Sequence, residues 1–169
     1  MGGVFKEQIV KRRPTNKDSM KRFGLIAGVF VITVIAFTMI PPFAPFIMLA
    51  AGFGAWFLMS YLNVEYEYAF TDGELDIDII YNRTRRKRVF NARVNDFEIM
   101  AHIDDKMHMG EFGGAQEVRD YSSGVTSDNT YAFLINYRGK RLKVIIEPNE
   151  MMLKAFATVL TRRRLHVKL

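Results

Sequence analysis

Two charge-free apolar runs, separated only by a proline pair, constrain this chain more than any other feature. The first run covers residues 23–40 and the second residues 43–62. A helix needs about 20 apolar residues to cross a bilayer core, with about 17 as the lower limit. Both runs meet this limit, the first only just, and Pro41 and Pro42 suit a tight turn that starts a second helix. The sequence therefore predicts a two-helix transmembrane hairpin over residues 23–62.

Three other structures are compatible with such a pair of runs to different degrees. A cleaved signal peptide has a shorter apolar core and precedes a soluble protein, whereas here a second apolar run follows at once. A buried helix pair in a soluble protein needs surrounding helices, and the sequence offers none to enclose it. A re-entrant hairpin stays open as an alternative, because the first run is close to the minimum spanning length.

The basic excess of the chain lies almost entirely before the first apolar run. Residues 1–22 hold seven basic and two acidic side chains, and residues 64–169 hold 17 basic and 16 acidic ones. This distribution disfavours a nucleic-acid-binding domain, which carries its excess on the folded surface. Because short cytoplasmic flanks are rich in Lys and Arg, we expect a multi-pass inner-membrane protein with both termini in the cytoplasm. The predicted parts are a basic cytoplasmic tail (1–22), the hairpin (23–62) and a cytoplasmic domain (63–169).

Small residues on both predicted helices permit close helix approach. Gly24 and Gly28 are four residues apart on the first helix, and Ala51 and Ala55 have the same spacing on the second. The favoured interpretation is packing of the hairpin against itself, and the alternative is a homo-oligomer formed through these faces.

After the hairpin, the apolar period changes to two, which is typical of strands. Residues 64–71 and 74–81 alternate in this way on either side of Asp72-Gly73, a preferred two-residue hairpin turn. The turn places Phe70 opposite Leu75, and the apolar face is then continuous, so register and turn agree.

The other face of this strand pair predicts a charge pattern. It places Glu67 opposite Asp78, and like charges in opposite positions are unfavourable. A basic run at residues 85–88 opens a third strand, and we expect Arg88 beside Asp78. Pairing of acidic and basic rows is therefore the favoured interpretation, and a site for anionic lipid headgroups or a protein partner is the alternative. The candidate contacts for that alternative are the basic side chains of this turn and of the C-terminus: Arg83, Arg85, Arg86, Lys87, Arg162, Arg163, Arg164 and Lys168.

The sequence of the rest of the domain predicts more strands and one helix. Residues 97–103 alternate, whereas residues 104–129 form a long glycine-containing connection in which residues 115–121 are the best candidate for a hidden strand. Residues 130–147 form a second hairpin with a continuous apolar face. Pro148 ends it, and an amphipathic helix follows.

This order of elements resembles bacterial membrane proteins that have two N-terminal helices followed by a bacterial pleckstrin-homology-like (PH-like) domain. The most similar stretch is residues 64–89, with the turn at residues 72–75 and the basic third strand at residues 85–88. The resemblance implies a membrane α-helical hairpin followed by an α+β domain, a PH-like antiparallel β-sandwich or barrel closed by a C-terminal helix. Lipid-binding members of the wider fold gather basic residues on the first hairpin loop. Here that loop, residues 71–74, is acidic, so the resemblance implies a fold more than a function.

The sequence gives no sign of catalysis. It contains no cysteine, and the spacing of His102 and His108 matches no helical metal-binding pair. We therefore expect a non-enzymatic protein without cofactor or metal. The predicted function is a membrane-anchored binding or scaffold module at the inner leaflet, and the alternative is a subunit of a larger membrane complex. The expected partners are the lipid bilayer, anionic lipid headgroups, and a protein partner or second copy, but no nucleic acid.

Overall fold

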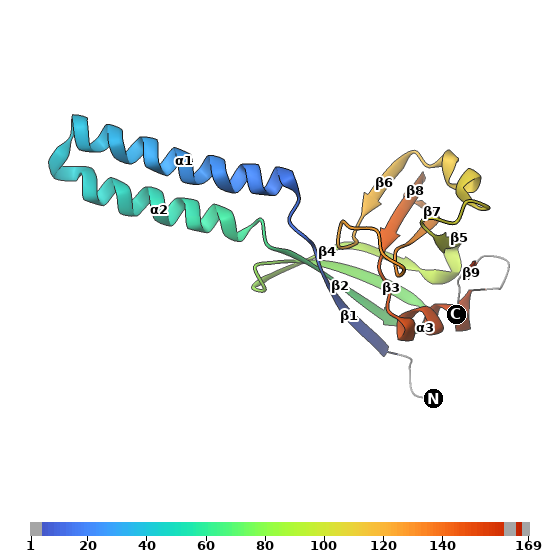
Figure 1. Ribbon diagram of the computed structural model, residues 1–169. Helices are drawn as coiled ribbons and strands as arrows, with labels where there is room; N and C mark the ends of the chain where they lie inside the picture. Colours follow the sequence, from blue (N-terminus) through green and yellow to red (C-terminus); the bar gives the residue numbers. More distant parts are fainter. Residues whose placement is uncertain (1–4, 161–164, 167–169) are drawn as a thin grey trace. The chain divides into compact units, whose positions relative to one another are not determined.

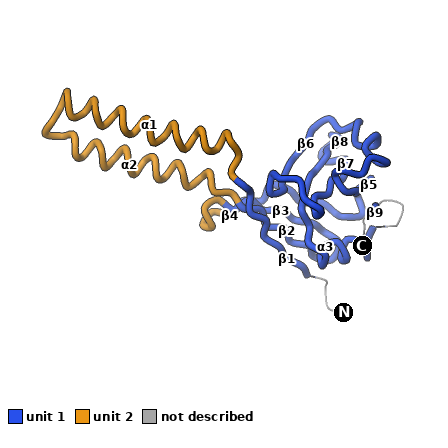
Figure 2. The backbone as a smooth tube through the Cα atoms, in the orientation of Figure 1, with its two compact units in different colours: residues 1–13, 65–80, 86–169 blue, residues 14–64, 81–85 orange. Residues whose placement is uncertain are grey.

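The chain divides into two compact units, and each unit is built from segments that are separate in the sequence (Figure 2). The computed structural model describes residues 5–160 and 165–166. The sheet unit comprises residues 1–13, 65–80 and 86–169, and the hairpin unit comprises residues 14–64 and 81–85. In the sequence, the helical hairpin is therefore an insertion between two segments that belong to the same sheet unit.

The hairpin unit contains two antiparallel helices, α1 (Asn16–Met39) and α2 (Ala44–Ser60), joined by the short 3-10 turn Pro41–Phe43 (Figure 1). Helix α1 begins before the first apolar run, because Thr15 and Asp18 form a capping box at its N-terminus. The Thr15 amide and hydroxyl both donate to the Asp18 carboxylate, at 3.0 and 2.8 Å. At 1.5 Å per residue, α1 is about 36 Å long. By length and composition alone, α1 and the span Pro41–Ser60, which joins the 3-10 turn and α2, are long and apolar enough to cross a membrane.

Small residues are buried in the hairpin, whereas most of its large apolar side chains are exposed. Ala36, Ala44 and Ala55 are buried. Phe30 and Phe46 are 69% and 70% exposed. A helix pair with apolar residues all round suits an apolar surrounding better than water.

The sheet unit contains two sheets and one C-terminal helix (Figure 1). The first sheet has the spatial order β1 (Phe5–Lys11), β2 (Val64–Thr71), β3 (Glu74–Tyr81) and β4 (Arg85–Arg93). The second has the order β6 (Glu117–Asp120), β8 (Lys140–Ile146), β7 (Tyr131–Tyr137), β5 (Phe97–His102) and β9 (Leu165–His166). Helix α3 (Glu150–Val159) follows β8, and its Phe156 ring packs edge-on against Phe70 of β2 at 5.4 Å between centroids.

Strand β1 was not predicted from the sequence. It lies within residues 1–22, which were predicted to be a basic tail. It pairs antiparallel with β2 and buries Val10. The Gln8 amide is tied to the start of α3: its Nε2 donates to the Glu147 carbonyl at 2.8 Å, and its Oε1 accepts from the Asn149 amide at 2.7 Å. Residues before the hairpin are thus part of the folded domain.

Both predicted strand pairs are present. Strands β2 and β3 are neighbours in the first sheet. In the second, Phe133 is opposite Val144 and Ile135 is opposite Leu142, and all four are buried, so the predicted continuous apolar face is confirmed. The hidden strand predicted within residues 115–121 is β6.

The prediction of purely antiparallel sheets is wrong for the second sheet. Strand β6 runs parallel to β8, and β5 runs parallel to β9. Parallel neighbours need a long connection, and β7 with its flanking loop provides it between β6 and β8. Over the described residues the two sheets do not close into a barrel.

Aromatic side chains and one buried hydroxyl hold the two sheets together. The Phe90 ring of β4 lies 5.8 Å from the Phe133 ring of β7, measured between ring centroids. The fully buried Tyr68 donates its hydroxyl proton to the Tyr121 carbonyl at 2.6 Å and accepts from the Glu147 amide at 3.2 Å. Burial raises the pKa of Tyr68 well above its usual range, so this hydroxyl stays protonated.

Candidate functional site

The basic turn between β3 and β4 belongs to the hairpin unit (Figure 2). The Asn82 amide donates to the Asn63 carbonyl at 2.9 Å. The Arg85 guanidinium donates to the Tyr61 hydroxyl at 2.6 Å and lies 5.7 Å from the centre of that ring. The Tyr61 and Tyr81 rings are 6.0 Å apart. These contacts hold the turn against the C-terminal end of α2.

The backbone of the turn explains how it can reach α2. Asn82 and Arg83 both have positive φ angles, 47° and 58°. Asn adopts this left-handed conformation more readily than most residues, because its short side chain bonds locally. The Thr84 amide closes the turn by donating to the Tyr81 carbonyl at 3.1 Å.

Helix α1 contributes Arg22 to the same place. Its Nη2 donates to the Asn63 side-chain oxygen at 3.0 Å. Its Nε is buried and has no hydrogen-bond partner among the described residues. We call this cluster of the hairpin unit the hairpin base; its members are Arg22, Tyr61, Asn63, Tyr81, Asn82, Arg83 and Arg85.

All charges of the hairpin unit lie at this end of it. The unit has five basic side chains and one acidic one, and residues 23–64 carry none. The acidic side chain, Asp18, accepts hydrogen bonds from Thr15 in the α1 cap. The hairpin base therefore combines net positive charge with tyrosine rings at the end of an apolar helix pair, a composition suited to a membrane–water interface.

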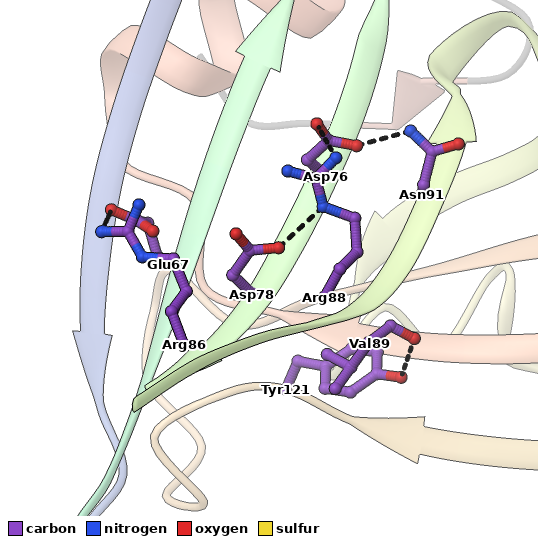
Figure 3. A network of polar contacts seen from close by, with 8 residues as sticks. All are labelled: Glu67, Asp76, Asp78, Arg86, Arg88, Val89, Asn91 and Tyr121. Atoms are coloured by element: carbon purple, nitrogen blue, oxygen red, sulfur yellow. Dashed lines mark hydrogen bonds and ion pairs between the residues drawn. The ribbon is translucent and has the colours of Figure 1, made fainter. Parts of the chain in front are cut away.

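The remainder of the basic run lies on the sheet unit and is paired there (Figure 3). Arg88 contacts Asp78 through Nε and Asp76 through Nη1, both at 2.8 Å. Arg86 contacts Glu67 at 2.8 Å. The predicted pair of Arg88 and Asp78 is thus confirmed. The basic run divides into two groups, because Arg86 and Arg88 neutralise acidic residues whereas Arg85 contacts α2.

Of the remaining candidate residues, the structure describes only Lys87. Lys87 is exposed on β4. The C-terminal candidates Arg162, Arg163, Arg164 and Lys168 lie outside the described residues.

The small residues of the hairpin are in different environments. Ala55 is buried and Ala51 is half-buried. No atom lies within 4 Å of a Cβ built on Gly24 or Gly28. A side chain at either glycine would therefore meet open space, and self-packing through these glycines and the homo-oligomer both stay predictions.

The histidines do not assemble a metal site in the described part of the chain. His108 and His166 stack at 3.7 Å between ring centroids, and His108 Nδ1 lies 2.8 Å from the Asp105 carboxylate. Over residues 5–160 and 165–166 there is no group of three or more His, Asp or Glu side chains that could hold a metal ion. The hairpin base is accordingly the candidate functional site.

Arg22 and Asn63 were not among the site residues predicted from the sequence. A signal was available, because these two residues flank the apolar hairpin on its two sides, and antiparallel helices bring such flanks together. Arg85 was a candidate, but its contact with Tyr61 depends on the direction that the turn takes.

A comparison with protein families covers nearly all of the chain. The family model described as Bacterial PH-like domain (DUF6106) matches residues 3–165. This range includes β1, the helical hairpin and both sheets. No curated protein and no solved structure matched the chain. Because the family model matches far more than half of the sequence, the chain belongs to the bacterial PH-like domain family DUF6106.

Proposed function

We propose that this protein is a membrane-anchored binding module of the inner membrane. Helices α1 and α2 cross the bilayer, and the hairpin base binds anionic lipid headgroups at the cytoplasmic surface. The PH-like domain is thereby tethered to the inner leaflet, where it meets its partner. The observation that carries the proposal is the contact of Arg85 with Tyr61, which fixes the basic turn to the end of α2.

The charge distribution of the hairpin unit supports a full crossing with a cytoplasmic base. A re-entrant hairpin was an alternative because the first apolar run is short. The uncharged part of α1, residues 23–39, is about 26 Å long at 1.5 Å per residue and meets the lower limit for a crossing. The basic residues at the base agree with the preference of Lys and Arg for cytoplasmic flanks.

The chemistry of the hairpin base supports an anionic ligand. Guanidinium groups present several N–H donors in a plane that matches phosphate oxygens. Arg22 has a buried Nε without an acceptor among the described residues, and an incoming phosphate oxygen could supply one after a small side-chain movement. Each basic residue close to an anionic surface contributes about 1 kcal/mol. Removing two therefore weakens binding by about 2 kcal/mol, which corresponds to about 30-fold.

Native mass spectrometry of the full-length protein tests this proposal. The protein is mixed in detergent with equal amounts of phosphatidylglycerol and phosphatidylcholine, and the retained lipid is counted. We expect the wild type to retain phosphatidylglycerol preferentially and the double variant Arg83→Glu/Arg85→Glu to lose that preference. Lys106→Glu, at an exposed loop position of the sheet unit, reverses one charge elsewhere and should behave as the wild type. Equal retention of both lipids by all three proteins would refute lipid binding at the base.

A role as a subunit of a larger membrane complex is the second candidate. It is favoured by the open space around Gly24 and Gly28, a helix surface that α2 does not fill. The same mass measurement decides it, because a complex retains additional protein mass after gentle extraction.

A further inference from the structure

Glu67 of β2 is a buried carboxyl group surrounded by charged side chains from the other three strands of its sheet. It is only 4% exposed, although it lies on the face of the sheet that carries the charged row (Figure 3). From β1, the Glu7 side chain shares a hydrogen bond with it. From β3, the Asp78 charge acts on it, and from β4 Arg86 donates to it at 2.8 Å. Arg88, also on β4, is near enough to interact with it electrostatically.

The contact between Glu7 and Glu67 requires a proton. An ionised carboxylate has no hydrogen to donate, so two carboxyl groups can hydrogen-bond only when one of them is protonated. Burial is the main cause that raises the pKa of Glu67, to about 7, and the hydrogen bond that protonated Glu67 donates to Glu7 adds to it. Arg86 acts in the opposite direction by stabilising the ionised form.

This carboxyl pair lies where the N-terminal strand joins the domain. In the β1–β2 ladder, Glu67 is opposite Ile9 and Glu7 is opposite Ala69. Among the residues that the structure describes, strand β1 is at the edge of its sheet and has β2 as its neighbouring strand. Its chain continues directly into α1, which begins at Asn16. Repulsion between two ionised carboxylates at this position would therefore act on the attachment of β1.

We propose that the Glu7–Glu67 pair is a proton-dependent clasp, which fastens β1 to β2 at mildly acidic pH and loosens as the pH rises through neutrality. Opening affects the N-terminal connection of the hairpin and leaves its C-terminal connection to β2 in place. The clasp would make the coupling between the membrane hairpin and the PH-like domain sensitive to cytoplasmic pH.

The direction and size of the effect follow from proton linkage. When β1 detaches, Glu67 becomes hydrated and its pKa returns toward the ordinary 4.5, so opening releases a proton and is favoured at higher pH. With values of 4.5 in the open state and about 7 in the closed state, the closing equilibrium weakens about ten-fold between pH 6 and pH 8 and then levels off.

Hydrogen exchange of the full-length protein in nanodiscs tests the clasp. Protection of peptides that cover β1 is measured by mass spectrometry at pH 6 and pH 8 and corrected for the intrinsic exchange of the same sequence unfolded. We expect the wild type to lose about ten-fold protection in β1 over this range. Glu67→Gln should show no such loss, because an amide does not titrate and can still donate to Glu7.

Two further variants make the result specific. Glu65→Gln changes the same strand, opposite Lys11, and should keep the pH dependence of the wild type. Glu7→Gln removes the second carboxylate but leaves Glu67 buried, so it should reduce the pH dependence below that of the wild type, and the test remains decisive if Glu67→Gln fails to fold. The proposal is overturned if β1 protection in the wild type depends on pH no more than in Glu7→Gln, or if carbon NMR shows that Glu67 titrates near 4.5.

Discussion

Replacement of Tyr68 by Phe removes a single hydroxyl that joins the two sheets. This hydroxyl donates to the Tyr121 carbonyl and accepts from the Glu147 amide, at 2.6 and 3.2 Å. Tyr121 directly follows β6 and Glu147 directly follows β8. One oxygen atom on β2 therefore holds the ends of two strands of the second sheet.

The expected cost follows from the two backbone groups that the variant leaves unpaired. A buried polar group without a partner costs about 1–3 kcal/mol. Tyr68 and the carbonyl that it bonds are buried together, whereas the Glu147 amide is only partly buried and can be hydrated in part. We therefore expect the free energy of unfolding to fall by about 2–4 kcal/mol, with no change in fold.

Urea unfolding of the full-length protein in micelles measures this loss. Hydrogen exchange of β7 and β8 peptides serves as the readout, because it reports the sheet unit and not the helices. Tyr131→Phe is the matched control: Tyr131 is 3% exposed, and its hydroxyl has no hydrogen bond to any described residue. The control should change the free energy by less than about 0.5 kcal/mol. The reasoning fails if both variants lose the same stability, because the bridging hydroxyl would then contribute nothing specific.

Three other substitutions probe separate parts of the structure. Gln8→Ala should release β1 and raise its hydrogen exchange at least ten-fold while β7 stays protected, because two hydrogen bonds to the start of α3 are lost. Arg88→Glu should lower the free energy of unfolding by about 1 kcal/mol, since it breaks two 2.8 Å ion pairs, whereas Arg93→Glu, with one 3.5 Å pair, should have no measurable effect in the same urea titration. Ala55→Phe should lower the thermal stability of the hairpin in micelles by overpacking a buried position, and Gly24→Ala, at an open position, should not.

The strand pairs could be predicted from sequence because local signals and the apolar pattern agree. At Asp72-Gly73 and at Arg138-Gly139 both residues have positive φ angles, as a tight two-residue hairpin turn requires. Each turn fixes the register, and each register makes one face continuously apolar. No long-range information was needed.

Strand β1 could not be predicted because almost nothing in its own sequence marks it as a strand. Val10 is its only buried residue, and its apolar Phe5 and Ile9 are exposed. The strand exists because β2 offers a free edge and Gln8 finds partners more than 130 positions away. Tertiary pairing of this kind overrides a weak local pattern.

The candidate site was only partly predicted, because some of its contacts also depend on tertiary structure and not on local sequence. The charge row was predictable, because Arg88 and Asp78 are set by the register of neighbouring strands. The contact of Arg85 with Tyr61 was not, because it depends on the left-handed backbone at Asn82 and Arg83, which turns the chain toward α2.

Cysteine labelling of the intact membrane tests the central claim, a spanning hairpin with its base in the cytoplasm, most directly. The chain has no native cysteine, so Phe43→Cys in the turn between the helices and Lys106→Cys in the sheet unit each give one reactive site. Both positions are exposed. In spheroplasts treated with a membrane-impermeant maleimide, we expect Phe43→Cys to be labelled and Lys106→Cys to be labelled only after permeabilisation. Protection of Phe43→Cys until permeabilisation would mean that the hairpin does not cross, and labelling of Lys106→Cys from outside would contradict the cytoplasmic placement of the domain.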